Sequence, residues 1–164
     1  WRTKFIGWSL IQRPVVGHGM VFYSTGYATP VLQAAKIDGT GDVTKSHIVW
    51  SEKKAVPNTP SLLLVGDDLY MLSDGGVLTC MDAKKGTIIY SERVKGTYSA
   101  SPLLADGKIY LTSEQGNGTL IQAGREFKVL GEFDMKEKTF ASFVGVDGDL
   151  FVRTETKLYK FKSK

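Results

Sequence analysis

Residues 59–70 read Thr-Pro-Ser-Leu-Leu-Leu-Val-Gly-Asp-Asp-Leu-Tyr, and residues 101–110 read Ser-Pro-Leu-Leu-Ala-Asp-Gly-Lys-Ile-Tyr. Each stretch is an apolar strand, an Asp/Gly turn and a second strand with an aromatic residue, a pattern typical of a β-hairpin. Residues 13–23 and 141–151 repeat it. The aligned aromatic residues are Phe22, Tyr70, Tyr110 and Phe151, at separations of 48, 40 and 41 residues. The chain is therefore built from a repeat of about 40 residues.

Further strands follow each hairpin. A third apolar strand is expected at residues 31–37, 77–81, 119–123 and 157–161. A fourth is expected in the first three units, ending near Trp50, Tyr90 and Leu130. Four strands per period, without a helical pattern, predict an all-β fold of the β-propeller type. A β-sandwich is the alternative, and the regular period argues against it.

The phase of the repeat predicts the domain organisation. We expect a single propeller segment with blades at residues 10–54, 55–96 and 97–138 and an incomplete last blade at 139–164. Residues 1–9 are expected to be the end of a preceding blade or a strand that closes the last one, because Trp1 precedes Pro14 much as Trp50 precedes Pro60. The segment, of about four four-stranded antiparallel blades, either closes as a small ring or is part of a ring of roughly seven or eight blades; we favour the larger ring.

A turn motif points to a family. Residues 78–90 read Leu-Thr-Cys-Met-Asp-Ala-Lys-Lys-Gly-Thr-Ile-Ile-Tyr, which resembles the Asp-Ala-x-x-Gly-x-x-x-Trp signature of PQQ-type propeller repeats, with Tyr90 in place of Trp. Residues 37–50 keep a stretched version that ends at Trp50. In the third unit Gly124 stands at the Asp position and Leu130 at the Trp position. The chain is similar to bacterial PQQ-repeat proteins related to the outer-membrane assembly lipoprotein BamB, a resemblance that implies a scaffold.

Composition limits the partners. The formal charge is +4, but Lys and Arg are scattered rather than clustered, so we expect no nucleic-acid partner. No apolar stretch approaches the roughly 20 residues of a membrane helix. Cys80 is the only cysteine, which excludes an internal disulfide and favours a buried structural thiol.

The chemistry-bearing residues form no recognisable catalytic set. Quinoprotein dehydrogenases, which share the repeat, need a Ca²⁺ site, a base and a Trp floor for their cofactor. We identify no catalytic, cofactor-binding or metal-binding residues and expect no cofactor. Residues 38–42 are interpreted as a turn rather than a Ca²⁺ loop. His18 and His47, the two histidines, lie on different strands and are too few for a zinc site without help from carboxylates. His18 stands between two glycines in a turn and is interpreted as an exposed or capping residue.

The resulting hypothesis is a non-catalytic scaffold that binds a protein or other ligand on its loop face. Residues 25–30, 39–46, 73–76, 113–118 and 153–156 are the expected recognition surface. The expected partner is another protein or the remaining half of the propeller, and two copies pairing their open edges is a further hypothesis. The resemblance implies a periplasmic or exported bacterial protein. The alternative is part of a quinoprotein-like oxidoreductase or carbohydrate-active propeller enzyme whose catalytic residues lie in a missing N-terminal portion. Whether the whole protein is an enzyme stays open, and we expect this segment not to be catalytic.

Overall fold

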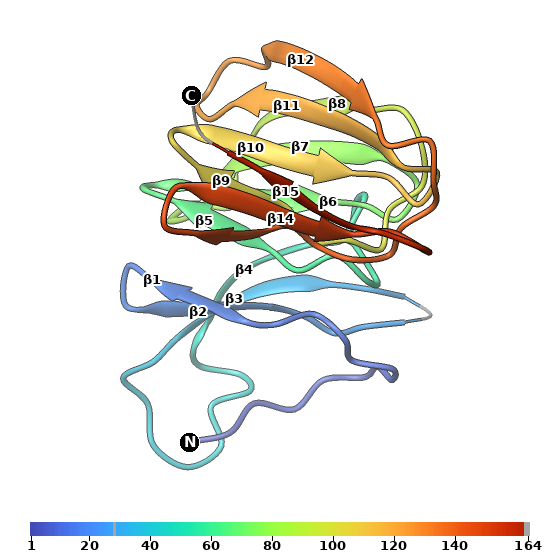
Figure 1. Ribbon diagram of the computed structural model, residues 1–164. Helices are drawn as coiled ribbons and strands as arrows, with labels where there is room; N and C mark the ends of the chain where they lie inside the picture. The colour runs from blue at the N-terminus through green and yellow to red at the C-terminus, as the bar shows by residue number, and fades with distance from the viewer. Residues whose placement is uncertain (28, 163–164) are drawn as a thin grey trace.

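Four antiparallel sheets follow one another along the chain in a computed structural model that describes residues 1–27 and 29–162 (Figure 1). Ala28, within the expected recognition segment 25–30, and Ser163 and Lys164, at the end of the last expected blade, lie outside the described residues. All secondary-structure elements in the described residues are β-strands, which confirms the predicted all-β class. The described residues contain no helix that is long and apolar enough to cross a membrane.

The strands of each sheet pair in chain order. The first sheet contains β1 (Val15–Gly17), β2 (Met20–Ser24), β3 (Leu32–Lys36) and β4 (Ile48–Glu52). The second contains β5 (Leu63–Val65), β6 (Asp68–Leu72), β7 (Val77–Asp82) and β8 (Ile88–Arg93). The third contains β9 (Leu103–Ala105), β10 (Lys108–Thr112), β11 (Asn117–Gln122) and β12 (Val129–Asp134). The fourth contains three described strands, β13 (Val144–Val146), β14 (Asp149–Arg153) and β15 (Leu158–Phe161).

Tight turns join the first two strands of each sheet. In the third sheet Asp106 and Gly107 both have positive φ, 48° and 67°, and in the fourth Asp147 and Gly148 have 50° and 82°. Two successive residues with positive φ form the turn whose twist matches that of paired strands. The Asp-Gly pairs of the repeat are therefore two-residue hairpin turns, as the sequence predicts.

Three apolar clusters hold the four sheets together. Phe22 and Leu32 of the first sheet pack with Leu69 and Met71 of the second. The opposite face of the second sheet packs on the third, and the third packs on the fourth. A sheet with two apolar faces buries them only by stacking, which explains why the repeat forms a propeller arc rather than isolated hairpins.

Serine side chains link the sheets beside their first strands. The Arg13 N–H donates to Ser61 Oγ at 3.0 Å, the Ser61 N–H to Ser101 Oγ at 2.9 Å, and the Ser101 N–H to Ser142 Oγ at 2.8 Å. These partners are 48, 40 and 41 residues apart, the separations of the aligned aromatic residues. The same bond thus recurs between each pair of neighbouring sheets.

The N-terminal residues lie along the first sheet (Figure 1). The Arg2 N–H donates to Gly41 O, and the Tyr27 N–H donates to Trp8 O, both at 2.8 Å. The indole N–H of Trp1 donates to Ile37 O at 2.9 Å. Residues 2–8 therefore contact the loops at both ends of β3 rather than β15.

Candidate functional site

Four of the five expected recognition loops lie on one face of the arc, where the second and third strands of each sheet connect. In each loop a hydroxyl group accepts the backbone N–H that closes the turn: Ser73 from Val77, Ser113 from Asn117, Thr154 from Lys157 and Thr25 from Val31. We call this surface, formed by residues 25–27, 73–76, 113–116 and 154–157 with the linkers that precede β1, β5, β9 and β13, the loop face. Because each turn is closed in the same way, its backbone is held in one arrangement.

Residues 39–46 are not part of the loop face. They connect the end of β3 to β4, whereas residues 25–31 connect β2 to the start of β3, so the two segments lie at opposite ends of this strand (Figure 1). The expectation that both belong to one recognition surface is wrong, because consecutive connections of an antiparallel sheet alternate between its two ends.

Carboxylates in or beside the loops hold the linkers between sheets. Asp74 accepts the Asn58 N–H at 2.6 Å, and Glu114 accepts the Ser99 hydroxyl at 2.5 Å. Glu137 accepts from the Lys157 ammonium and from the hydroxyls of Thr154 and Thr156. The Lys157 ammonium, with those hydroxyls, lowers the pKa of Glu137 to about 2. These acids rigidify the face.

Three aromatic side chains on the loop face are mainly exposed. Trp8 is 60% exposed and Tyr27 52%, and their rings meet edge-on with centroids 4.9 Å apart. Phe140, 62% exposed, follows Thr139, whose N–H donates to Glu114 O in the neighbouring loop. Exposed aromatic side chains on a fixed backbone are typical of protein-binding surfaces. Sequence reasoning marked the Tyr27 loop but missed Trp8 and Phe140.

The other candidate polar residues have structural partners. His18 Nε2 lies 2.9 Å from Gly66 O and 3.4 Å from Asp67, so it joins the hairpin turns of the first two sheets. His47 lies 3.6 Å from Asp38, far along the chain from His18. Within residues 1–27 and 29–162, no group of three or more His, Cys, Asp or Glu side chains is arranged to hold a metal ion.

Asp42 closes its own turn. It accepts the hydroxyl of Thr44 at 2.7 Å and its N–H at 3.2 Å. These two bonds are the main reason why the pKa of Asp42 lies below its usual value. The hydrogen-bonded turn thus lies at residues 42–46, after residues 38–42, which form bends and a bridge to Arg2.

The blade-linking aromatic residues contact the following sheet. The Trp50 indole N–H donates to Ala83 O at 2.9 Å, and a Cβ placed on Gly86 would stand 2.6 Å from the Trp50 ring. Tyr90 meets Phe127 edge-on, with ring centroids 5.7 Å apart. Each aromatic side chain of a fourth strand thus packs on the turn that precedes the fourth strand of the next sheet.

The third sheet has no aromatic residue at the position of Trp50 and Tyr90. The sequence alignment assigns this position to Leu130, one residue before the true equivalent, Gly131. Trp50 pairs with Ala34 in the first sheet, and Tyr90 pairs with Cys80 in the second. The residue of the third strand equivalent to Ala34 and Cys80 is Leu120, and it pairs with Gly131, not with Leu130. Leu130 is the extra residue of a β-bulge and is 38% exposed. A Cβ on Gly131 would meet no atom within 4 Å, so the position is open.

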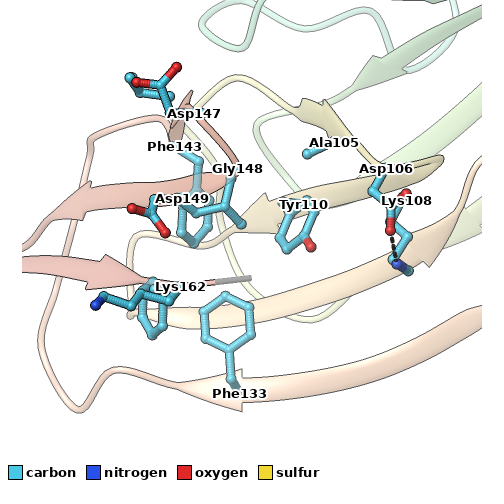
Figure 2. A pocket seen from close by; sticks show the side chains of 14 residues that line it. Ala105, Asp106, Lys108, Tyr110, Phe133, Phe143, Asp147, Gly148, Asp149 and Lys162 are labelled. Carbon is cyan, nitrogen blue, oxygen red and sulfur yellow. Dashed lines mark hydrogen bonds and ion pairs between the residues drawn. The ribbon is translucent and has the colours of Figure 1, made fainter. Parts of the chain in front are cut away.

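A cleft of about 830 Å³ lies between the third and fourth sheets (Figure 2). Its apolar wall contains Tyr110, Phe133, Phe143 and Phe161, and ring centroids of neighbouring pairs are 5.9 to 6.5 Å apart. The hairpin turns at residues 105–108 and 146–149, with Lys162, form its rim. Hereafter we call this feature the aromatic cleft. No sequence pattern marked it.

Burial in the second sheet keeps the Tyr70 hydroxyl and the Cys80 thiol in their neutral forms. Cys80 pairs directly with Tyr70 and Tyr90 on its neighbouring strands. The Tyr70 hydroxyl accepts the Gly124 N–H at 2.7 Å and lies 3.0 Å from Gly124 O. Desolvation raises the pKa of Tyr70 to about 12 and that of the Cys80 thiol to about 11. Cys80 is therefore a protonated core residue, as the sequence predicts.

The stacked sheets of three or four described strands and their blade-linking contacts define a PQQ-type β-propeller segment. The sequence profile of the family described as outer membrane protein assembly factor BamB matches residues 42–126, and the chain belongs to this family. No curated protein matches the chain.

Solved structures share the fold at low sequence identity. BamB from Moraxella catarrhalis is 15% identical, with a TM-score of 0.69 over 88% of this chain and 43% of BamB. A quinohemoprotein alcohol dehydrogenase from Pseudomonas putida is 14% identical, with a TM-score of 0.66 over 86% of this chain and 28% of the enzyme. A computationally designed protein is 8% identical, with a TM-score of 0.71 over 92% of this chain and 45% of the design. The chain spans less than half the length of each.

Proposed function

We propose that this chain is a non-catalytic propeller scaffold that binds a protein partner through its loop face. The observation that carries the proposal is the exposed edge-on pair of Trp8 and Tyr27 on a backbone fixed by hydrogen bonds. Large aromatic side chains that lose little conformational freedom on binding are typical energetic centres of protein interfaces. The family description, an outer membrane protein assembly factor, supports a role in assembly.

The compartment is part of the same proposal. Membership of the BamB family supports a periplasmic or exported scaffold in a bacterial cell. The likeness to a quinohemoprotein alcohol dehydrogenase concerns the fold, so it adds no activity to this chain.

Site-specific photo-crosslinking in cells tests the proposal. A photoreactive phenylalanine analogue replaces Tyr27 in one variant and Phe140 in another, both on the loop face. It replaces Lys85 in the control, because Lys85 is exposed in a turn at the opposite end of the strands. We expect one discrete heteromeric adduct from the loop-face positions and none from the control.

Two results would count against the scaffold. One is the same set of adducts from all three positions, because this would mean that the loop face has no preference over the opposite face. The other is oxidation of alcohols or sugars by the purified chain supplied with PQQ and Ca²⁺, which would replace the scaffold with the quinoprotein alternative.

A further inference from the structure

Each linker between neighbouring sheets on the loop face has exposed lysine side chains near its start. Residues 53–62, 94–102 and 135–143 connect the four sheets and contain five lysines but only one acidic residue, Glu137. All five lysines are exposed: Lys53, Lys54, Lys95, Lys136 and Lys138. Because each linker joins two described sheets, these positions lie within the arc and not at either end of the chain.

Carboxylates beside the linkers bind donor groups of the chain itself. Glu52, at the end of β4, accepts the N–H groups of Lys53 and Lys54, both at 2.7 Å. Asp74 and Glu114 hold the next two linkers through Asn58 and Ser99, as described above. All three acidic residues are partly buried. Their carboxylates therefore face the linkers, whereas the lysines face solvent.

The third linker shows this separation of charge most clearly. The side chain of Lys136 is 82% exposed, whereas that of Glu137, which accepts from the Thr156 hydroxyl, is 16% exposed. Lys138 is exposed as well, and Phe140, 62% exposed, stands two residues further along the same linker. The linker thus presents two lysines and one aromatic ring to solvent.

Hydrogen bonds fix the backbone that carries the lysines. The Lys95 carbonyl group accepts the Tyr98 hydroxyl at 2.8 Å, and the Lys138 carbonyl group accepts the Glu155 N–H at 3.1 Å. Neither lysine forms an ion pair with a carboxylate of residues 1–27 and 29–162. An acidic group from another molecule can therefore pair with Lys95 and Lys138 without displacing an acid of the chain.

We propose that the protein partner of the loop face presents an acidic segment that includes an apolar residue. Its carboxylates pair with the exposed lysines of successive linkers, and its apolar residue packs on Phe140. The inference rests on the function proposed above and adds the chemistry of the partner. An apolar contact surrounded by complementary charges is a common arrangement in protein interfaces.

The stacking of the sheets limits how the acidic residues are spaced. Neighbouring sheets pack about 10 Å apart, which is the length of about three residues of extended chain. A segment that runs from Lys95 to Lys138 therefore carries acidic residues that are about three or more positions apart.

An acidic protein segment fits the face better than an anionic lipid surface does. The exposed ring of Phe140 follows Thr139, whose N–H and hydroxyl groups are bound to Glu114 O and Arg153 O. A ring held in this way offers one defined apolar contact among the lysines. A partner with a fixed sequence can match that contact, whereas a fluid layer of headgroups matches only the charge.

Charge reversal in the photo-crosslinking assay tests the chemistry of the partner. The photoreactive phenylalanine analogue replaces Phe140, and Lys95→Glu and Lys138→Glu are introduced together into the same chain. We expect the yield of the heteromeric adduct to fall about tenfold, because two attractive contacts become repulsive. Lys95→Arg with Lys138→Arg should keep the yield within about twofold, because the charge is retained.

Lys85→Glu with Lys128→Glu provides the matched control. Both lysines are exposed and lie at the opposite end of the strands, so the change of charge is the same but its place differs. The control should keep the adduct yield within about twofold. Both Glu variants should unfold at the urea concentration of the parent chain, because all the changed side chains are exposed. In mass spectrometry, the crosslinked partner peptide should contain more Asp and Glu than Lys and Arg.

The outcomes separate this inference from the function on which it rests. A full adduct yield from Lys95→Glu with Lys138→Glu would overturn the inference and leave the proposed function standing. Absence of any heteromeric adduct from the Phe140 position of the parent chain would count against the proposed function itself. Sedimentation of the purified chain with phosphatidylglycerol vesicles, lost in the Lys95→Glu, Lys138→Glu variant and without a protein adduct, would replace the acidic segment with a membrane surface.

Discussion

The contact between Trp50 and Gly86 predicts a measurable coupling between neighbouring blades. Gly86 has a φ of +70°, and a Cβ at this position would lie 2.6 Å from the Trp50 ring. Gly86→Ala therefore combines a left-handed backbone penalty of about 1–2 kcal/mol with overpacking of about 1–3 kcal/mol. We expect the free energy of unfolding to fall by about 2–5 kcal/mol in total.

Gly66 provides the control, because it has a φ of +58° and no atom within 4 Å of its added Cβ. Gly66→Ala should cost only the backbone penalty of about 1–2 kcal/mol. In a Trp50→Ala background the obstructing ring is gone, so Gly86→Ala should cost no more than Gly66→Ala.

Urea unfolding followed by circular dichroism provides the four free energies of the double-mutant cycle. The reasoning predicts a coupling of about 1–3 kcal/mol between Trp50 and Gly86. Strictly additive effects of Trp50→Ala and Gly86→Ala would refute it, because the two residues would then not share a contact.

Three further predictions concern buried or hydrogen-bonded groups. Tyr70→Phe should lower the free energy of unfolding by about 1–3 kcal/mol in urea titrations, because the half-buried N–H and C=O groups of Gly124 both lose the Tyr70 hydroxyl as a partner; an unchanged midpoint would contradict this. Glu137 has a pKa of about 2 in the folded chain, below its usual 4.5, so its stabilisation is complete above about pH 4.5 and is lost as the pH falls toward 2. Unfolding at pH 5 and pH 2 should show a smaller loss for Glu137→Gln than for the parent chain, whereas Glu155→Gln, in the same loop region, should behave like the parent; equal losses in all three would contradict the assignment. Burial and a pKa of about 11 should make the Cys80 thiol react slowly with a disulfide reagent at pH 8 and rapidly in urea; rapid reaction of the folded chain would show that the thiol is accessible.

The repeat allowed the strands to be predicted because its signals are local. The hairpin turn at Asp106-Gly107 and the alternation of the strands beside it depend on a few neighbouring residues. Since the same pattern recurs at nearly constant spacing, the all-β propeller class followed from the sequence.

Register across strands was harder to predict. The connection between the third and fourth strands is one residue longer in the third sheet, from Ile121 to its partner Val129, than in the second sheet, from Met81 to its partner Ile88. Counting 40 residues from Tyr90 therefore reaches Leu130, where the structure has Gly131. The grouping of residues 39–46 with 25–30 failed for a related reason: the two loops are near in sequence but lie at opposite ends of β3. Avoiding either error requires knowledge of which strands pair and of where each connection lies.

The aromatic cleft left no local signal in the sequence. Its walls come from the hairpin β9–β10, from β12 and from the last sheet, and Phe133 and Phe161 meet only when those sheets stack. Gly131, two residues before Phe133 on β12, supplies no side chain to this interface. A local sequence pattern can indicate which residues form a strand or a turn, but not whether two stacked sheets leave a cavity between them.

Photo-crosslinking at the loop face tests most directly the claim that this scaffold binds a protein partner there. A photoreactive phenylalanine analogue at Tyr27 should form one discrete heteromeric adduct, whereas the same analogue at Lys85, in an exposed turn at the opposite end of the strands, should form none. The same adducts from Tyr27 and Lys85 would contradict the claim.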